Sequence, residues 1–267
     1  MDSIIGSVVE LANKQLTKPF VPGKTYIYPA APSLNSDDVA ILVRVALQYW
    51  YTEWKYCAKL ERGLSHAMSK HHVSLVNSGS SALLVAINAA ILKHEMEYGK
   101  QDRYILTCST GFPTTVSPIY QLGYIPVYVD MNRDLIPNMN QVEKVLNSYI
   151  GSRVCGAVFA HTLGFTFNES KVRDLLGSRR FLVSDCCDAF GASMEDGNLV
   201  GSMADLATLS FFPSHHIMSA EGGAILTDND ELADLVRSLS NWGRSCFCRP
   251  GENDTCGSRF SIVTGKQ

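Results

Sequence analysis

This sequence has no strong excess of charge and no long apolar run. Its 23 lysines and arginines are balanced by 26 aspartates and glutamates. The two signs are interspersed, so the chain offers no basic patch for nucleic acid. Its apolar runs have the length of strands, well below the ~20 residues of a membrane-spanning helix, so no membrane insertion is expected.

No signal peptide is expected either, because residues 1–18 have no basic segment before an apolar core. We therefore expect a cytoplasmic protein. In that compartment the eight cysteines should not form structural disulfides.

Lysine is missing from a long part of the chain, between Lys171 and Lys266. That part contains the stretch SFFPSHHIMSAEGGAI, residues 210–225, in which His215 and His216 are adjacent. Lysine forms Schiff bases with carbonyl groups. Histidine forms no stable imine, but it can transfer protons near neutral pH. Any proton transfer on this loop would therefore depend on histidine.

Helical and strand-like patterns alternate along the chain. One long amphipathic helix is predicted over 36–70, beginning at a cap at Ser36. Further helices are predicted over 80–96 and 230–242. Short apolar strands are predicted at 72–77, 104–108, 125–130, 156–161, 181–186, 204–211 and 222–227. This alternation predicts an α/β fold with a mainly parallel sheet covered on both faces.

Ligand sites in such sheets lie in loops after the carboxyl ends of strands. Gly79, Ser80 and Ser81 open a helix there, and they form either an ordinary cap or a turn that binds phosphate. Asp185 ends an apolar strand, where an isolated carboxylate is costly unless it is paired. It either accepts a capping N–H or faces a protonated heterocyclic nitrogen. Phe112, taken alone, is most simply a core residue.

In chain order, these residues are similar to those of the fold-type-I pyridoxal-phosphate enzymes. The closer resemblance is to the DegT/DnrJ/StrS sugar aminotransferase family, through KPFVPGK (18–24), GFPTTVSPIYQLGYIPVYVD (111–130) and AHTLG (160–164). It implies an N-terminal segment, 1–35, and a large domain, 36–267. The family's C-terminal small domain is expected to be absent or truncated.

The resemblance also implies roles for these residues. Gly79, Ser80 and Ser81 would hold the cofactor phosphate with help from Ser210. Phe112 would stack on the cofactor ring. Asp185 would pair with the pyridine nitrogen, so that the ring acts as an electron sink.

His215 occupies the position of that family's catalytic lysine. The sequence HHI resembles a small branch that removes the C-3 hydroxyl of 4-keto-6-deoxy nucleotide sugars with pyridoxamine 5′-phosphate. The resemblance implies that His215 is the base at the cofactor C4′ carbon, whereas a lysine could divert the reaction toward transamination. We expect Asp188 to assist and His216 to be structural. His161, at another strand end, either lines the pocket or is packed.

Cys246, Cys248 and Cys256 form a C-x-C-x7-C run in a loop over 244–260, and Cys187 follows Asp185 by two residues. Four thiolates suit either iron–sulfur or zinc. Their spacing resembles the iron–sulfur CDP-4-keto-6-deoxyglucose 3-dehydratases of 3,6-dideoxyhexose synthesis for lipopolysaccharide. The resemblance therefore implies a [2Fe–2S] cluster that relays electrons from a flavin or iron–sulfur reductase, in a homodimer.

Three alternatives remain at this point. The first is a cluster-free enzyme like the GDP-4-keto-6-deoxymannose 3-dehydratases. The second is a sugar aminotransferase-like enzyme, and the third is a truncated homologue without catalytic activity.

Overall fold

The computed structural model describes residues 2–16, 19–28 and 34–245. The helices are α1 (Asp2–Leu16), α2 (Ser36–Ala46), α3 (Lys55–Met68), α4 (Gly79–Tyr98), α5 (Pro113–Gln121), α6 (Met139–Leu146), α7 (Glu169–Leu176) and α8 (Asp230–Ser240). The strands are β1 (His72–Val76), β2 (Tyr104–Cys108), β3 (Ile125–Val129), β4 (Val154–Ala160), β5 (Phe181–Asp185), β6 (Leu206–Ser210) and β7 (Gly223–Thr227). Two short 3-10 turns are η1 (Gly151–Arg153) and η2 (Thr162–Gly164).

The seven strands form one sheet in the order β1-β7-β6-β5-β4-β2-β3. The pairs β2–β3, β2–β4, β4–β5 and β5–β6 are parallel. Strand β7 is antiparallel to both β1 and β6, so it alone runs against the rest. The predicted α/β fold with a mainly parallel sheet is confirmed.

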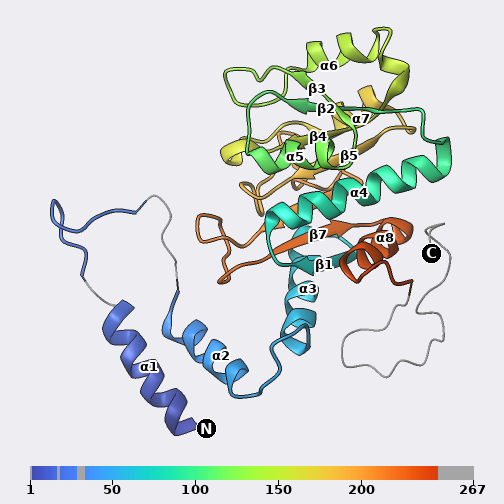
Figure 1. Cartoon of the computed structure of the whole chain (residues 1–267). Coiled ribbons are helices and arrows are strands. Elements are labelled where there is room, and N and C mark those ends of the chain that lie inside the picture. The colour runs from blue at the N-terminus through green and yellow to red at the C-terminus, as the bar shows by residue number, and fades with distance from the viewer. Residues whose placement is uncertain (1, 17–18, 29–33, 246–267) are drawn as a thin grey trace.

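Helices cover both faces of the sheet. Helix α4 lies over the sheet and contacts mainly β6 and β7, with α8 and α5 against it (Figure 1). It buries nine of its residues, because it is apolar around most of its circumference. Residues from α6 and α7 pack into the core on the other face, and α3 packs against β1. The carboxyl ends of β4, β5 and β6 therefore open between two helical layers.

The prediction of one helix over 36–70 was wrong, because α2 ends at Ala46 and α3 begins at Lys55. Between them Tyr49 has a left-handed backbone (φ 57°), which a helix cannot contain. The Tyr51 hydroxyl donates to the Ala46 carbonyl and ties the break together. The cap of α2 is Asn35 rather than Ser36, since the Asn35 side chain accepts from two backbone N–H groups.

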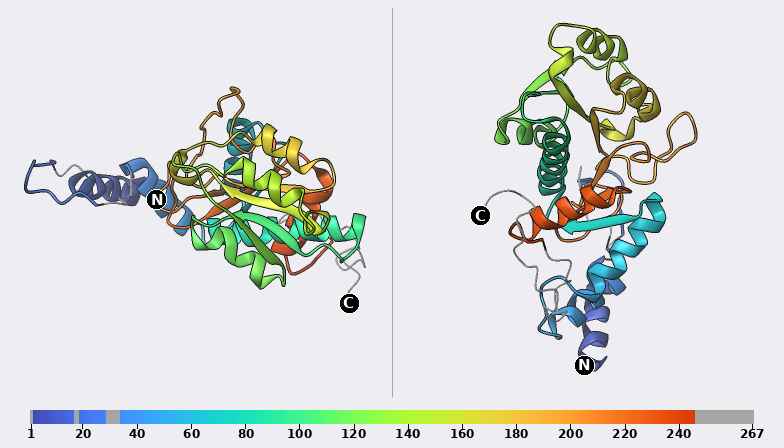
Figure 2. Two further views of the ribbon diagram at one scale, coloured as in Figure 1. Left: turned by 90° about the horizontal axis from the view of Figure 1, so that it is seen from above. Right: turned by 90° about the vertical axis from the view of Figure 1, so that its right-hand side faces the viewer.

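Helices α1 and α2 contact each other and extend away from the sheet (Figure 2). Helix α2 buries none of its residues, and apolar side chains such as Leu11 and Leu42 are exposed. The predicted boundary at residue 35 stays a prediction. Among the residues that the structure describes, no helix combines the length and apolar character needed to cross a bilayer.

Candidate active site

A cavity of about 350 Å³ lies at the carboxyl ends of β4, β5 and β6 and at the start of α4. It brings together eight of the predicted site residues: Gly79, Ser80, Phe112, Asp185, Cys187, Asp188, Ser210 and His215. Ser81 does not line it. Cys246, Cys248 and Cys256 lie outside the described residues.

The start of α4 forms one wall of the cavity. Ser78 caps the helix, because its Oγ accepts the Ser81 N–H at 3.1 Å. The helix cap is therefore Ser78, and not Gly79, Ser80 or Ser81. Gly79 and Ser80 still line the cavity, so the positive end of this 20-residue helix faces it.

Gly79 permits this helix to approach β6 closely. A Cβ at this position would lie 2.6 Å from Ser210 Cβ and 3.1 Å from Cys187 Sγ. No real Cβ tolerates the first distance. Because Gly79 has no side chain, the helix terminus packs directly against Ser210, and Gly79, Ser80 and Ser210 line one cavity in which a phosphate could bind.

Asp185 is buried and held by two donors. The Thr115 hydroxyl donates to Oδ2 at 2.8 Å, and the Cys187 N–H donates to Oδ1 at 3.2 Å. Thr115 lies on α5 and went unnoticed in the sequence, although it follows Phe112 by three residues. Phe112 itself is 67% exposed and lines the cavity, so the core interpretation for it was wrong.

His215 lies in the loop between β6 and β7, and it faces Asp188. Its Nδ1 is 3.2 Å from Asp188 Oδ1. The other carboxylate oxygen, Oδ2, accepts the Leu163 N–H at 3.1 Å. A proton on Nδ1 would face this carboxylate and leave the Nε2 lone pair free to act as a base. His216 is exposed and does not line the cavity.

His161 is both packed and part of the cavity wall. It is fully buried, and its ring stacks on Phe167 at 4.1 Å. Its Nε2 lies 3.0 Å from Glu169 Oε1, and its Nδ1 accepts the Phe167 N–H at 3.3 Å. Both ring nitrogens are therefore occupied within the protein. No signal in the sequence indicated Glu169, because it is the first residue of its helix and stands before the apolar residues that mark the buried face.

The adjacent cysteines after β5 face different surroundings. Cys186 is fully buried in the core, whereas Cys187 lines the cavity. Burial, and then the charge of Asp185, raises the pKa of Cys187 well above its ordinary value. All five cysteines in the described part of the chain are free thiols. The four-cysteine cluster stays a prediction, since only Cys187 belongs to that part.

Two proteins with similar sequences have names that indicate sugar biosynthesis. The chain is 37% identical over 261 residues to the lipopolysaccharide biosynthesis protein RfbH of Salmonella typhimurium, covering 97% of this chain and 59% of that protein. It is 36% identical over 267 residues to a dTDP-4-dehydro-2,6-dideoxy-D-glucose 3-dehydratase of Saccharopolyspora spinosa, covering 99% and 57%. The chain thus spans less than two thirds of the length of these relatives.

Solved structures share the fold. A GDP-4-keto-6-deoxymannose-3-dehydratase with a trapped PLP–glutamate geminal diamine aligns with a TM-score of 0.75 at 21% identity, covering 82% of this chain and 56% of that one. The Helicobacter pylori aminotransferase PseC aligns with a TM-score of 0.73 at 23% identity, covering 85% and 59%. The sequence model of the DegT/DnrJ/EryC1/StrS aminotransferase family matches residues 32–262, and the chain belongs to that family.

Proposed function

We propose that this chain forms the cofactor-binding large domain of a pyridoxamine 5′-phosphate-dependent nucleotide-sugar 3-dehydratase. The observation that carries this proposal is His215, which stands in the cavity with Asp188 at Nδ1 and with no lysine beside it in the cavity wall. The name of the Saccharopolyspora spinosa relative, a 3-dehydratase, supports the same reaction class.

The residues of the cavity fit the cofactor. Gly79, Ser80 and Ser210 would hold its phosphate at the start of α4, where the close approach of Gly79 to Ser210 brings the helix terminus and the serine to the same cavity wall. Phe112 would contact the ring, and Asp185 would accept from the protonated pyridine nitrogen. When bound, the cofactor supplies an amine that condenses with the sugar ketone and a ring that accepts an electron pair.

His215 would act as the base. Its Nε2 would take the proton from the cofactor C4′ carbon, and Asp188, 3.2 Å from Nδ1, would stabilise the imidazolium that forms. A carboxylate in this position also keeps the ring from rotating. Asp188 is therefore the residue that would set which nitrogen reacts.

For the substrate and the electron source we propose a CDP-4-keto-6-deoxyhexose and a [2Fe–2S] cluster. The cluster would be held by Cys187, Cys246, Cys248 and Cys256 and reduced by a flavin or iron–sulfur reductase. The position of Cys187 in the cavity wall supports this, because a cluster held there would lie next to the cofactor. The relationship to a lipopolysaccharide biosynthesis protein supports a role in making a sugar for surface polysaccharide. We propose a 3,6-dideoxyhexose as that sugar and a homodimer as the assembly.

A cluster-free dehydratase is the second candidate. A GDP-4-keto-6-deoxy-D-mannose 3-dehydratase of Escherichia coli is 26% identical over 218 residues. An anaerobic visible spectrum distinguishes the two: a cluster enzyme is coloured before pyridoxamine phosphate is added, whereas the cluster-free enzyme is not.

The test of the reaction is His215→Asn. We expect this variant to bind pyridoxamine phosphate with unchanged affinity and to lose dehydration of CDP-4-keto-6-deoxyglucose by at least ~100-fold, because the base is removed. His216→Asn is the matched control, and its turnover should stay close to that of the unaltered protein. Retained dehydration in His215→Asn would exclude this histidine as the base, and the reverse pattern would assign the role to His216.

A further inference from the structure

Glu169 is a fully buried carboxylate beside the proposed active site. It accepts hydrogen bonds from His161 Nε2 at 3.0 Å, from the Gly201 N–H at 2.7 Å and from the Met203 N–H at 3.0 Å. Burial by itself raises the pKa of Glu169, but the interactions with His161, followed by those with Ser184 and the Met203 backbone, more than offset it, and the pKa lies below its ordinary value. Glu169 is thus a buried anion that three donors stabilise.

These contacts fix the tautomer of His161. Because Nδ1 accepts the Phe167 N–H, the ring proton must lie on Nε2, where it is donated to Glu169. The thiol of Cys186 lies close to both groups, with all three ligand atoms within 4.8 Å of one another. A metal ion at Nε2 would have to displace that proton while Nδ1 still faces an N–H donor. His161, Glu169 and Cys186 therefore form a hydrogen-bonded group that holds the His161 ring in place, rather than a metal site.

The anchored ring closes a tight turn. The His161 carbonyl accepts the Gly164 N–H at 3.1 Å, and the Thr162 carbonyl accepts the Phe165 N–H at 3.0 Å. Leu163 within the turn is left-handed (φ 53°, ψ 24°), a conformation unfavourable for a side chain of this type. Burial of the Leu163 side chain does not offset the cost of this conformation, because that side chain is exposed. The surrounding contacts must hold this conformation.

The turn directs one backbone N–H at the catalytic pair. Leu163 N–H donates to Asp188 Oδ2 at 3.1 Å, and Asp188 Oδ1 lies 3.2 Å from His215 Nδ1. A Cβ on Gly164 would lie 3.2 Å from the Asp188 carbonyl, so the turn also packs closely against this residue. An Asp188 that lost the Leu163 contact could rotate away from His215.

We infer that Glu169 and His161 are positioning residues that fix the 161–167 turn, and through the Leu163 N–H and Asp188 set the orientation and tautomer of His215. The inference rests on the proposed role of His215 as the base. Neither positioning residue offers a polar atom to the substrate, because every polar side-chain atom of both is already hydrogen-bonded within the protein.

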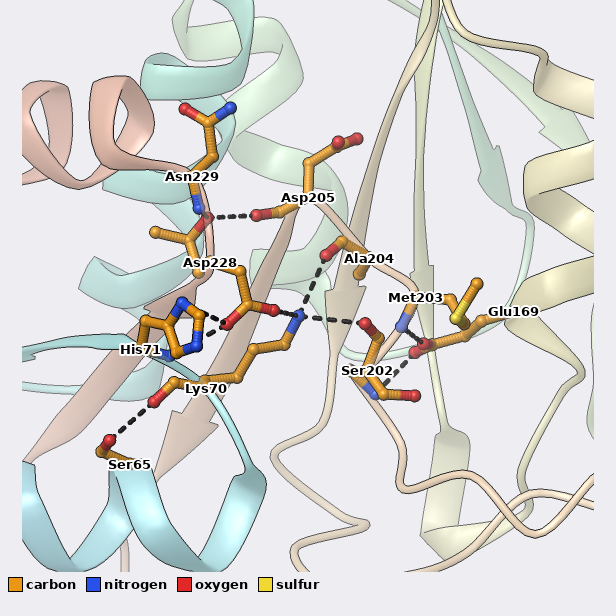
Figure 3. A network of polar contacts seen from close by, with 12 residues as sticks. Ser65, Lys70, His71, Glu169, Ser202, Met203, Ala204, Asp205, Asp228 and Asn229 are labelled. Carbon is orange, nitrogen blue, oxygen red and sulfur yellow. Dashed lines mark hydrogen bonds and ion pairs between the residues drawn. The ribbon is translucent and has the colours of Figure 1, made fainter.

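The other side of the 201–204 loop provides a matched control. Figure 3 shows Lys70 facing the loop from one side and Glu169 from the other. Lys70 Nζ donates to the Ser202 carbonyl at 3.0 Å and pairs with Asp228 at 2.8 Å. Lys70 therefore stabilises the same loop through a buried charge, but it makes no contact with His161 or its turn.

The test compares Glu169→Gln, His161→Phe and Lys70→Met in the full chain. An amide has one oxygen for the three donors that Glu169 satisfies, and phenylalanine keeps the stacking on Phe167 without either ring nitrogen. The ¹⁵N shifts of the His215 ring, assigned by their loss in His215→Asn, report its tautomer. We expect the Nδ1–H form in the unaltered protein and a mixture of tautomers in Glu169→Gln and His161→Phe. Dehydration should fall by up to ~100-fold in both.

Lys70→Met should lower the thermal unfolding midpoint without changing the His215 signals. Equal changes of those signals in Lys70→Met and Glu169→Gln would overturn the inference, because loosening of the loop would then explain both. Unchanged signals in Glu169→Gln and His161→Phe would overturn it as well. The ring signals need neither cofactor nor turnover, so they test the positioning even if His215 proves not to be the base.

Discussion

At the residue scale, the site depends on short distances between a few side chains and their neighbours. Gly79 has no side chain, which allows the start of α4 to approach Ser210 closely. The Thr115 hydroxyl and the Cys187 N–H orient the Asp185 carboxylate. These close contacts therefore determine whether the site could bind a phosphate and a pyridine nitrogen.

Gly79→Ala tests this spacing. The added Cβ would overlap Ser210, so we expect a loss of stability of about 1–3 kcal/mol, together with weaker pyridoxamine phosphate binding. Gly63→Ala is the control, because Gly63 lies inside α3 with nothing within 4 Å of an added Cβ. That variant should be more stable by about 0.4–1 kcal/mol. Thermal unfolding and fluorescence titration with the cofactor measure both effects. Normal cofactor affinity in Gly79→Ala would remove the start of α4 from the site.

At the element scale, the carboxyl end of β5 distributes neighbouring side chains between two environments. Successive residues of a strand point to opposite sides. Cys186 accordingly packs among Met194 and Ala207, while Asp185 and Cys187 reach the cavity. One strand end thus supplies both a core residue and two cavity residues.

Cys187→Ser and Cys186→Ser are expected to differ for this reason. In protein prepared without oxygen, Cys187→Ser should lose the iron and the visible colour, because a proposed ligand in the cavity wall is removed. Cys186→Ser should keep both, at some cost in stability from a buried hydroxyl. Iron content and absorbance are the measurements. Stoichiometric zinc in place of iron in the unaltered protein would contradict an electron-transfer role.

At the scale of the whole molecule, stability depends on buried titratable groups far from the cavity. His94, on α4, is buried between Tyr98 and Phe181, and its Nε2 makes no hydrogen bond within the described part of the chain. Burial lowers the pKa of His94 from its ordinary 6.5, and the nearby Asp102 only partly counteracts this. The folded protein therefore takes up this proton less readily than the unfolded chain does.

The sign of the pH dependence follows from linkage. As pH falls below 6.5, the unfolded chain binds the His94 proton first, so the free energy of unfolding decreases until the lower folded pKa is passed. His94→Phe should flatten this decrease between about pH 7 and about pH 5, as measured by urea unfolding. The unaltered protein, unfolded in urea at the same pH values, is the reference. An unaltered slope in His94→Phe would mean that other groups dominate.

The sequence by itself determined the α/β class, because short strands that are apolar on both sides, alternating with helices, have few other ways to bury their surface. It also determined the order of Gly79, Phe112, Asp185, Ser210 and His215 along the chain, and that order is what resembles the family. Local signals misplaced the helix over 36–70, since its helical period continues through residues 47–54, where a left-handed Tyr49 breaks it.

The tertiary structure alone decided how the site residues are held. Thr115 meets Asp185 across 70 positions of sequence, and Leu163 meets Asp188 across 25. No periodicity or spacing encodes such pairs, because they form only after strand order brings the carboxyl ends of β4, β5 and β6 together. The same holds for Glu169, whose three donors come from two separate loops. Sequence named the groups that could react, and packing set which atoms of those groups face one another.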